Sequence, residues 1–358
     1  MLRNSISRVL VCILLILGAQ SANAGEAGHA SRNLRVMTQN MDLGSDFAYI
    51  FKVLATTPND QTALLVAITQ TYLEVLASQI PVRAELLADE IQAKQPDLVA
   101  LQEVSTLATA PFGGPATTVV EDQLDDLLDA LEQRGLHYAP VTISQNADVT
   151  LPSLDATFQQ LIDVRLVDSD VVLARTDLSI AQFKLENVQK GNFAAALVVP
   201  IAGSNVAFPN GWIAMDAKLR GKTYRFVTTH LNSVSPVQAA QTSELLSGSL
   251  NTDLPVILVG DFNSDAHTPS FTSGPAYGML VGAGFLDVWS VLHPSDPGLT
   301  WPLFGEDPPF GPTTLIERID LALTKGSGIQ ATDIVRTGTT PPFASDHVGL
   351  VADFTLSP

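Results

Sequence analysis

The stretch VILVGDFN, from Val256 to Asn263, is the most informative part of this sequence. Its first four residues are β-branched or leucine, which is typical of a strand buried on both faces. Gly260 ends the run, and Asp261 and Asn263 follow where such a strand would leave the core. Asp and Asn are also ordinary turn residues, so this stretch alone predicts only a central strand with an acid and an amide at its end.

A second signal of the same kind lies near the C-terminus, where Ser345, Asp346 and His347 directly precede the strand-like run Val348 to Phe354. Similar residues stand at the ends of other apolar runs, after Leu34–Gln39, Leu98–Leu101 and Tyr224–Thr229 and before Leu321–Leu323. We expect these strand ends to form one cleft. Its candidate residues are Asn40, Glu103, His230, Asp261, Asn263, Asp320, Asp346 and His347.

These motifs occur in the order of a known family. After the strand ending in Asn40 come PDLVALQEV, THLNS, GDFNSD, ERIDLAL and SDHVGL. In this the chain resembles the endonuclease/exonuclease/phosphatase superfamily, the deoxyribonuclease-I-like metal-dependent phosphoesterases, and specifically a secreted bacterial-type member. The resemblance spans Leu34 to Phe354. It implies an α/β fold, a four-layer α/β sandwich of two mixed β-sheets packed face to face with helices outside.

Length and periodicity predict how the chain is organised. The 358 residues fit one large domain with insertions, which we place at 34–358. Pro81–Lys94 and Gln123–Arg134 have apolar residues at helical spacing, whereas about 46–80 is predicted to be a helical insertion near the cleft. Ala139–Asp163 is a second candidate insertion.

The N-terminus has the pattern of a secretory signal. Residues 1–24 have a basic start, an apolar segment from Val9 to Leu17 and a small-residue cleavage site ending at Ala24, followed by a tail over 25–33. A membrane anchor is the alternative, but the apolar segment is shorter than the roughly 20 residues that span a bilayer. We therefore predict a secreted or periplasmic protein. Cys12 is the only cysteine, so the mature chain would have no thiol and no disulfide.

The acidic composition bears on the substrate. The formal net charge is −18, and loss of Arg3 and Arg8 with the signal segment would make it −20. Such a charge repels phosphate backbones at long range and argues against a dedicated nucleic-acid binder, although a bound divalent cation can reverse the local potential. We expect a small-molecule or lipid phosphate ester in preference to nucleic acid, no stable membrane span, and a monomer.

The candidate residues suit a hard metal ion. Carboxylates and amide oxygens favour Mg²⁺, with Mn²⁺ as a possible substitute, over Zn²⁺. Because Mg²⁺ takes only one or two carboxylates from the protein, we expect Glu103 with Asn40 to bind the metal. The resemblance implies that Asp346 assists a second metal. It also implies that Asp261 orients or activates the attacking water, that Asn263 and His230 hold the phosphate, and that Asp320 orients His347. Whether His347 or Asp261 is the general base, and whether one or two metals bind, stays open.

The resulting function is a metal-dependent phosphoesterase that hydrolyses a phosphodiester or phosphomonoester by metal-assisted attack of water. An extracellular non-specific endonuclease is the alternative among enzymes, and a catalytically degenerate binding module on the same fold is the alternative outside them. The binding module is disfavoured because every motif residue is present. Other classes lack support. Gly221-Lys222-Thr223 lacks the first glycine of a phosphate-binding loop, the chain has no Gly-x-Ser-x-Gly elbow of a serine hydrolase, and it has no His-Glu-x-x-His motif of a zinc metalloprotease.

Overall fold

The computed structural model describes residues 33–201, 204–219, 221–303 and 315–356. The predicted signal segment and nearly all of the predicted tail lie outside these residues, and Asn33 is the first residue of strand β1. The strands are β1 (Asn33–Asn40), β2 (Leu98–Pro111), β3 (Thr118–Asp122), β4 (Tyr138–Leu154), β5 (Leu161–Arg175), β6 (Phe183–Asn192), β7 (Leu197–Ile201), β8 (Ser204–Phe208), β9 (Gly211–Leu219), β10 (Lys222–His230), β11 (Val256–Asp261), β12 (Leu286–Asp287), β13 (Asp320–Lys325), β14 (Ile329–Thr337) and β15 (Gly349–Leu356). The helices are α1 (Ala48–Thr56), α2 (Gln61–Ala77), α3 (Ile80–Lys94), α4 (Gln123–Gln133), α5 (Ser235–Ser247), α6 (Ala276–Gly282) and α7 (Val288–Leu292).

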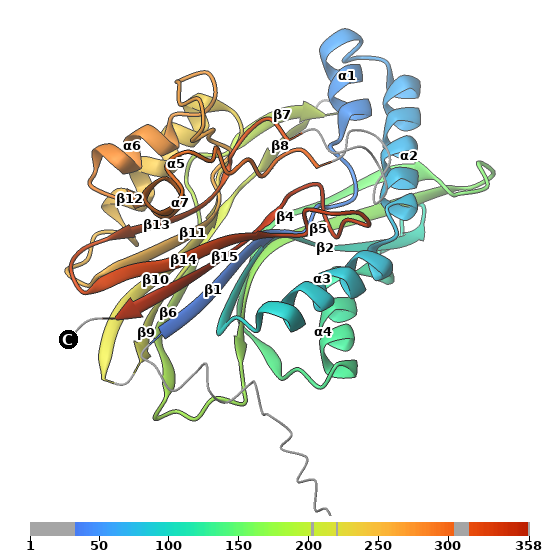
Figure 1. Ribbon diagram of the computed structural model, residues 1–358. Helices are drawn as coiled ribbons and strands as arrows, with labels where there is room; N and C mark the ends of the chain where they lie inside the picture. Colours follow the sequence, from blue (N-terminus) through green and yellow to red (C-terminus); the bar gives the residue numbers. More distant parts are fainter. Residues whose placement is uncertain (1–32, 202–203, 220, 304–314, 357–358) are drawn as a thin grey trace, which may run out of the picture. The chain divides into compact units, whose positions relative to one another are not determined.

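Two large sheets form the centre of the fold (Figure 1). One has seven strands in the order β14-β15-β1-β2-β5-β4, with β3 paired to β2, and the other has six in the order β12-β13-β11-β10-β9-β6. Both are mixed, because β1 runs parallel to β2 and β10 parallel to β11, whereas the other pairs within these sheets are antiparallel. Strands β7 and β8 form a separate hairpin.

The sheets pack face to face over a shared apolar core. Leu34 and Val36 of the first sheet lie in one buried cluster with Phe226 and Ile257 of the second. The outer face of the first sheet is covered by α3 and α4, and that of the second by α5 and α6. The predicted four-layer sandwich is therefore confirmed.

The two predicted helices are present, as α3 and α4, each within a residue or two of the predicted bounds. Ala139–Asp163 is not an insertion outside the sheet, because it forms β4 and the beginning of β5 in the first sheet. Strand β4 lies at the edge of that sheet, where Pro140 and Pro152 are tolerated since an edge strand need not donate every backbone hydrogen bond.

Segment 46–80 contains α1 and α2, which pack against each other. Asp60 caps the N-terminus of α2, and its carboxylate accepts hydrogen bonds from the backbone N–H groups of Thr62 and Ala63. Among the described residues, no single helix is long and apolar enough to cross a membrane. Helices α2 and α3 reach the required length and apolar composition only as a pair, and they are bent by 45° at the break between them.

The parallel pairs explain how distant motifs meet. Asn40 pairs with Gln102 where β1 and β2 end their pairing, and His230 pairs with Asp261 where β10 and β11 end. Asp261 also pairs with Asp320 at the beginning of β13. Since parallel strands deliver their carboxyl ends to one edge, the polar residues of both sheets are carried to the same end of the sandwich.

Candidate active site

Backbone geometry within β2 and just after β11 turns two site residues toward the cleft. Glu103 lies in an irregularity of β2, where the pairing with β5 shifts between Leu101 and Val104, and its φ of 56° is in the left-handed region. Asn263 has a φ of 47° just after β11. Non-glycine residues adopt this conformation at a cost and are concentrated at functional sites.

Gly260 has to be a glycine. Its φ is 141°, and a Cβ atom placed on it would lie 2.0 Å from the backbone oxygen of Thr229 on β10. The close approach of β10 and β11 at this point brings His230 beside Asp261. The first residue after the apolar run in VILVGDFN therefore sets the spacing of two site residues.

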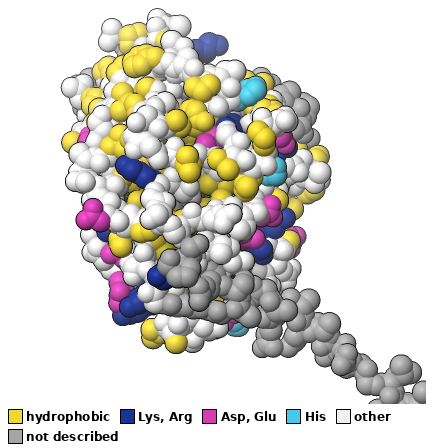
Figure 2. All heavy atoms as spheres, turned by 60° about the vertical axis from the view of Figure 1, so that its left-hand side comes forward, with side chains coloured by type: hydrophobic (Ala, Val, Ile, Leu, Met, Phe, Trp, Pro, Cys, Tyr) yellow, Lys and Arg dark blue, Asp and Glu magenta, His cyan; other side chains and the backbone are white. Residues whose placement is uncertain are grey.

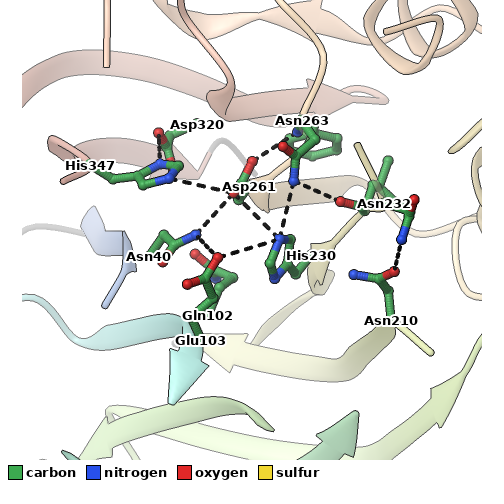
Figure 3. A network of polar contacts seen from close by, with 12 residues as sticks. Asn40, Gln102, Glu103, Asn210, His230, Asn232, Asp261, Asn263, Asp320 and His347 are labelled. Carbon is green, nitrogen blue, oxygen red and sulfur yellow. Dashed lines mark hydrogen bonds and ion pairs between the residues drawn. The ribbon is translucent and has the colours of Figure 1, made fainter. Parts of the chain in front are cut away.

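Asp261 lies at the centre of the site (Figure 3). The Asn40 side-chain nitrogen donates a hydrogen bond to Asp261 Oδ2 at 3.0 Å and another to Glu103 Oε1 at 2.9 Å. The second Glu103 oxygen accepts from the backbone N–H of Leu43 at 3.0 Å. Asn40 is fully buried and joins the two sheets, because it lies on β1 whereas Asp261 ends β11. It thereby fixes the positions of both carboxylates.

His347 is held by Asp320 on the other side of Asp261. Its Nδ1 atom lies 2.9 Å from Asp320 Oδ2, and its Nε2 atom lies 3.9 Å from Asp261 Oδ2. Burial lowers the pKa of His347, but Asp320, Asp346 and Asp261 together outweigh this and raise its pKa well above the usual value. The Asp320 carboxylate thus fixes the tautomer and orientation of the ring, as a carboxylate partner does for histidine generally.

His230 and Asn263 form the opposite wall. The Asn263 amide nitrogen donates to the Leu231 carbonyl at 2.8 Å and lies 3.1 Å from His230 Nε2. Because the Leu231 contact fixes the amide orientation, Nε2 of the neutral ring is the acceptor and Nδ1 holds the proton. Burial lowers the pKa of His230, yet the surrounding acids, Asp261 foremost, raise it overall.

Asp346 lies at the edge of this group. Its Oδ2 atom accepts a hydrogen bond from Trp301 Nε1 at 3.1 Å, and its Oδ1 atom lies 3.9 Å from His347 Nε2. Burial raises the pKa of Asp346, although nearby His347 lowers it. All eight residues singled out in the sequence are therefore brought to one end of the sandwich.

Three further residues belong to this region and were missed in the sequence. Asp168 and Asp170 lie on β5, and both contribute to raising the pKa of His230. Burial raises the pKa of Asp168 to about 6 and that of Asp170 well above its usual value. Their i, i+2 spacing in a strand, which places both on one face, is the signal that could have identified them. Thr300 accepts hydrogen bonds from the backbone N–H groups of Ile319 and Asp320, each at 3.2 Å, and no sequence pattern marks it.

The donor set fits a divalent cation. Glu103, His230 and Asp261 have ligand atoms within 4.8 Å of one another, and so do Asp261, Asp320 and His347. Asp320 Oδ1 is buried without a hydrogen-bond partner in the described part of the chain. Burial, and to a lesser extent Asp320, raises the pKa of Asp261, so a positive charge nearby would stabilise its ionised form. A metal ion would supply that charge.

The orientation of Asn40 bears on how it would contact a metal. Its side-chain oxygen accepts the backbone N–H of Asp42 at 2.9 Å, so its nitrogen faces Glu103 and Asp261. In this arrangement Asn40 orients the carboxylates. A metal contact through its oxygen would require the amide to turn and to give up the Asp42 hydrogen bond.

Comparisons with known proteins agree with this architecture. An endonuclease/exonuclease/phosphatase family protein from Leptotrichia buccalis is similar with a TM-score of 0.54 and 15% identity, over 90% of this chain and 100% of that one. A Bacteroides vulgatus endonuclease/exonuclease/phosphatase has a TM-score of 0.53 and 15% identity, over 91% and 99%. The catalytic domain of human nocturnin has a TM-score of 0.51 and 17% identity, over 91% and 94%. At these identities the likeness shows a common fold.

A search of curated proteins found no match to this sequence. The model of the endonuclease/exonuclease/phosphatase family, whose members hydrolyse phosphoester bonds and generally depend on divalent metals, matches residues 76–347. That match covers most of the chain and includes every site residue except Asn40. The chain therefore belongs to the endonuclease/exonuclease/phosphatase family.

Proposed function

We propose that this protein is a magnesium-dependent phosphoesterase that hydrolyses a phosphodiester or phosphomonoester by attack of water on phosphorus. The observation that carries the proposal is the pair of supported groups around Asp261, with His347 held by Asp320 on one side and Asn40 joining Asp261 to Glu103 on the other. Such mutually oriented acids and imidazoles are the elements of proton transfer and charge stabilisation at a reacting phosphate.

In the proposed reaction a P–O bond to water forms as the P–O bond to the leaving group breaks. The proton of the water passes to Asp261 or to Nε2 of His347, which lie 3.9 Å apart and so can face the same water molecule. Asn263 and His230 hold a phosphoryl oxygen. Asp320 keeps the His347 ring in position and stabilises its protonated form.

Mg²⁺ or Mn²⁺ is the proposed cofactor, with Glu103 and neighbouring carboxylates as its ligands and Asp346 available for a second ion. When bound, the cation supplies positive charge next to the phosphoryl oxygens, a contribution of several kcal/mol in sites of this kind. Carboxylates are the ligand type that Mg²⁺ prefers, and an oxygen-rich set with only two imidazoles favours it over Zn²⁺.

Charge supports a small or lipid ester as the substrate. The whole chain has 19 Lys and Arg residues against 37 Asp and Glu residues. On the face shown in Figure 2, Lys and Arg side chains are scattered and do not gather into a patch. Proteins that bind nucleic acid tightly place many Lys and Arg side chains at the phosphates. We therefore rank an extracellular nuclease second. We also propose that the protein acts outside the cytoplasm, as a monomer, after cleavage near Ala24.

A substrate panel tests this proposal. The purified protein with Mg²⁺ is assayed against bis(p-nitrophenyl) phosphate, p-nitrophenyl phosphate, sphingomyelin and duplex DNA, with kcat/KM measured across a range of salt concentrations. We expect hydrolysis of at least one non-nucleic ester to exceed that of DNA, with little salt dependence. Clear preference for DNA with a steep decline in salt would instead rank the nuclease first. Failure to hydrolyse any of the four would favour a binding module.

A further inference from the structure

A cavity of about 330 Å³ extends away from the catalytic residues. One end is lined by Glu103, His230 and Asn263, all of which belong to the site described above. The cavity is therefore continuous with the place where the phosphate is proposed to bind. Its volume is at the lower end of the range for small-molecule pockets, roughly 300 to 1,000 Å³.

The other end of the cavity is apolar. It is formed where α1 and α2 lie against β4 and the hairpin β7–β8, as Figure 1 shows. Leu54 of α1, Ile68 of α2 and Ile201 of β7 line it, together with Val149 and Leu151 of β4. None of these five side chains offers a hydrogen-bonding group, so this end favours hydrocarbon or aromatic surface, whereas the hydroxyl-bearing residues Thr71 and Tyr72 of α2 also line the cavity.

This cavity opens to solvent, and its apolar side chains are left without packing partners on one side. Protein cores contain few voids larger than a water molecule, because unfilled apolar space loses dispersion contacts and hydrophobic stabilisation. Water gains little at the apolar end, since the side chains there offer it no hydrogen-bond partners. If each ligand atom took about the 30 Å³ that a water molecule occupies in the liquid, the cavity would hold roughly ten non-hydrogen atoms.

We infer that the cavity binds the hydrocarbon part of an amphiphilic phosphate ester whose phosphate lies among Glu103, His230 and Asn263. The inference rests on the proposed function and narrows its substrate to phosphate esters of apolar alcohols. Segment 46–80 is then the element that gives this chain its substrate preference, because α1 and α2 provide one wall of the apolar end. Phe51 of α1 lines the cavity with 43% of its surface exposed, and so lies at its rim.

Chain length is the variable that tests this inference. Turnover is measured on soluble p-nitrophenyl alkyl phosphate diesters with alkyl groups from methyl to decyl, each below its micelle concentration. Burial of each methylene is expected to raise kcat/KM by up to roughly fourfold, until the apolar end is full, which comes before about ten carbons because part of the volume lies at the phosphate end. A flat series, or a gain seen only when the ester is presented in vesicles, would overturn the inference.

Two variants with matched controls locate the effect. Val149 lines the cavity, whereas Thr150 next to it is exposed and points to the other face of β4. Val149→Trp should fill the apolar end and abolish the rise of kcat/KM with chain length, while the methyl ester is hydrolysed as before. Thr150→Trp should keep this rise.

A second pair of variants lies on α1. Leu54→Ser, a milder change at a half-buried position, should reduce the rise of kcat/KM with chain length, whereas Tyr49→Ser, outside the cavity, should not. Equal gains in all four folded variants would contradict the assignment.

Binding gives a readout that does not depend on catalysis. Calorimetric Kd values are compared for ethyl-, butyl- and octylphosphonate, whose P–C bond is not an ester bond. We expect octylphosphonate to bind at least tenfold more tightly than ethylphosphonate, and Val149→Trp to remove that difference. Tail-dependent binding without hydrolysis of any ester would contradict the proposed function and support the cavity assignment. Hydrolysis without tail dependence in rate or binding would contradict the cavity assignment alone.

Discussion

The imidazole Nδ1 of His347 and the Oδ2 atom of Asp320 lie 2.9 Å apart, and both side chains are almost completely buried. Asp320 begins β13 and His347 directly precedes the strand-like run that ends the chain, so the pair depends on the fold and not on sequence proximity. A histidine restrained in this way presents its other nitrogen in a fixed direction, toward Asp261. The chemistry of the site is organised around this restraint.

Replacing His347 should abolish most of the activity without unfolding the protein. His347→Ala is expected to lower kcat by about 10² to 10⁴, the usual contribution of an acid–base or phosphate-stabilising group. Steady-state kinetics measure the effect, and the thermal unfolding midpoint reports on the fold. His137→Ala, an exposed histidine outside the site, serves as the control. Near-normal turnover in folded His347→Ala would remove this residue from the mechanism.

Replacing Asp320 should shift the pH dependence of the rate to lower pH. Burial lowers the pKa of His347 and Asp320 is the largest influence that raises it, so Asp320→Asn should lower that pKa. If neutral His347 is the base, activity is lost as pH falls through its pKa, and the acidic limb moves to lower pH. If protonated His347 stabilises the phosphate, activity is lost as pH rises, and the alkaline limb moves to lower pH. The pH profile of kcat therefore identifies the role, and a profile with neither limb moved would show that Asp320 does not act through His347.

Glu103→Gln should act through metal binding. The change keeps the shape of a side chain that lies between Asn40 and Leu43 but removes its charge. We expect activity to require a higher Mg²⁺ concentration and to recover in part when Mg²⁺ is raised, because one ligand is weakened while the other carboxylates remain. Mg²⁺ titrations of the rate measure this. A defect that is the same at every Mg²⁺ concentration would require another role for Glu103.

Much of this site could be predicted from the sequence, because a buried strand is recognisable as a continuous run of apolar residues. Val256–Val259 is a continuous apolar run, and polar residues directly after such a run lie where the chain leaves the core. Most motif residues lie at the ends of the described strands, as expected. Glu103 is the exception, because β2 continues to Pro111 and does not end after Leu101. The order of the motifs identified the family and thus the sandwich.

The features that the sequence did not predict lie on strand β4 at the edge of its sheet, on strand β5 and in the cavity. Strand β4 includes Pro140 and Pro152 and alternates weakly, so its pairing with β5 depends on long-range contacts that no local pattern expresses. Asp168 and Asp170 lie on β5, outside the motifs that mark the other site residues, and only the pairing of β5 with β2 and β4 brings them near the site. For 46–80 the sequence predicts a helical insertion near the cleft but not a cavity, since its depth depends on how α1, α2 and the hairpin β7–β8 pack. The roles assigned to individual site residues stay predictions.

Gly260→Ala should destabilise the fold strongly. The added methyl would meet the Thr229 backbone oxygen, and the φ of 141° is unfavourable for any other residue. We expect a loss of about 3 kcal/mol or more in the free energy of unfolding, from overpacking and backbone strain together. Gly282→Ala is the matched control, because a Cβ there meets nothing within 4 Å. Denaturant titration compares the two, and similar small losses in both would contradict the close approach of β10 and β11.

The rate of phosphate-ester hydrolysis before and after removal of divalent metal tests the central claim most directly. The rate on the best substrate of the panel is measured in excess EDTA, and again after the chelator is removed and Mg²⁺ or Mn²⁺ is added. Because the carboxylates and imidazoles around Asp261 form a donor set that fits a divalent cation, the account predicts that hydrolysis is lost in EDTA and restored by either metal. Full activity in excess EDTA would contradict it.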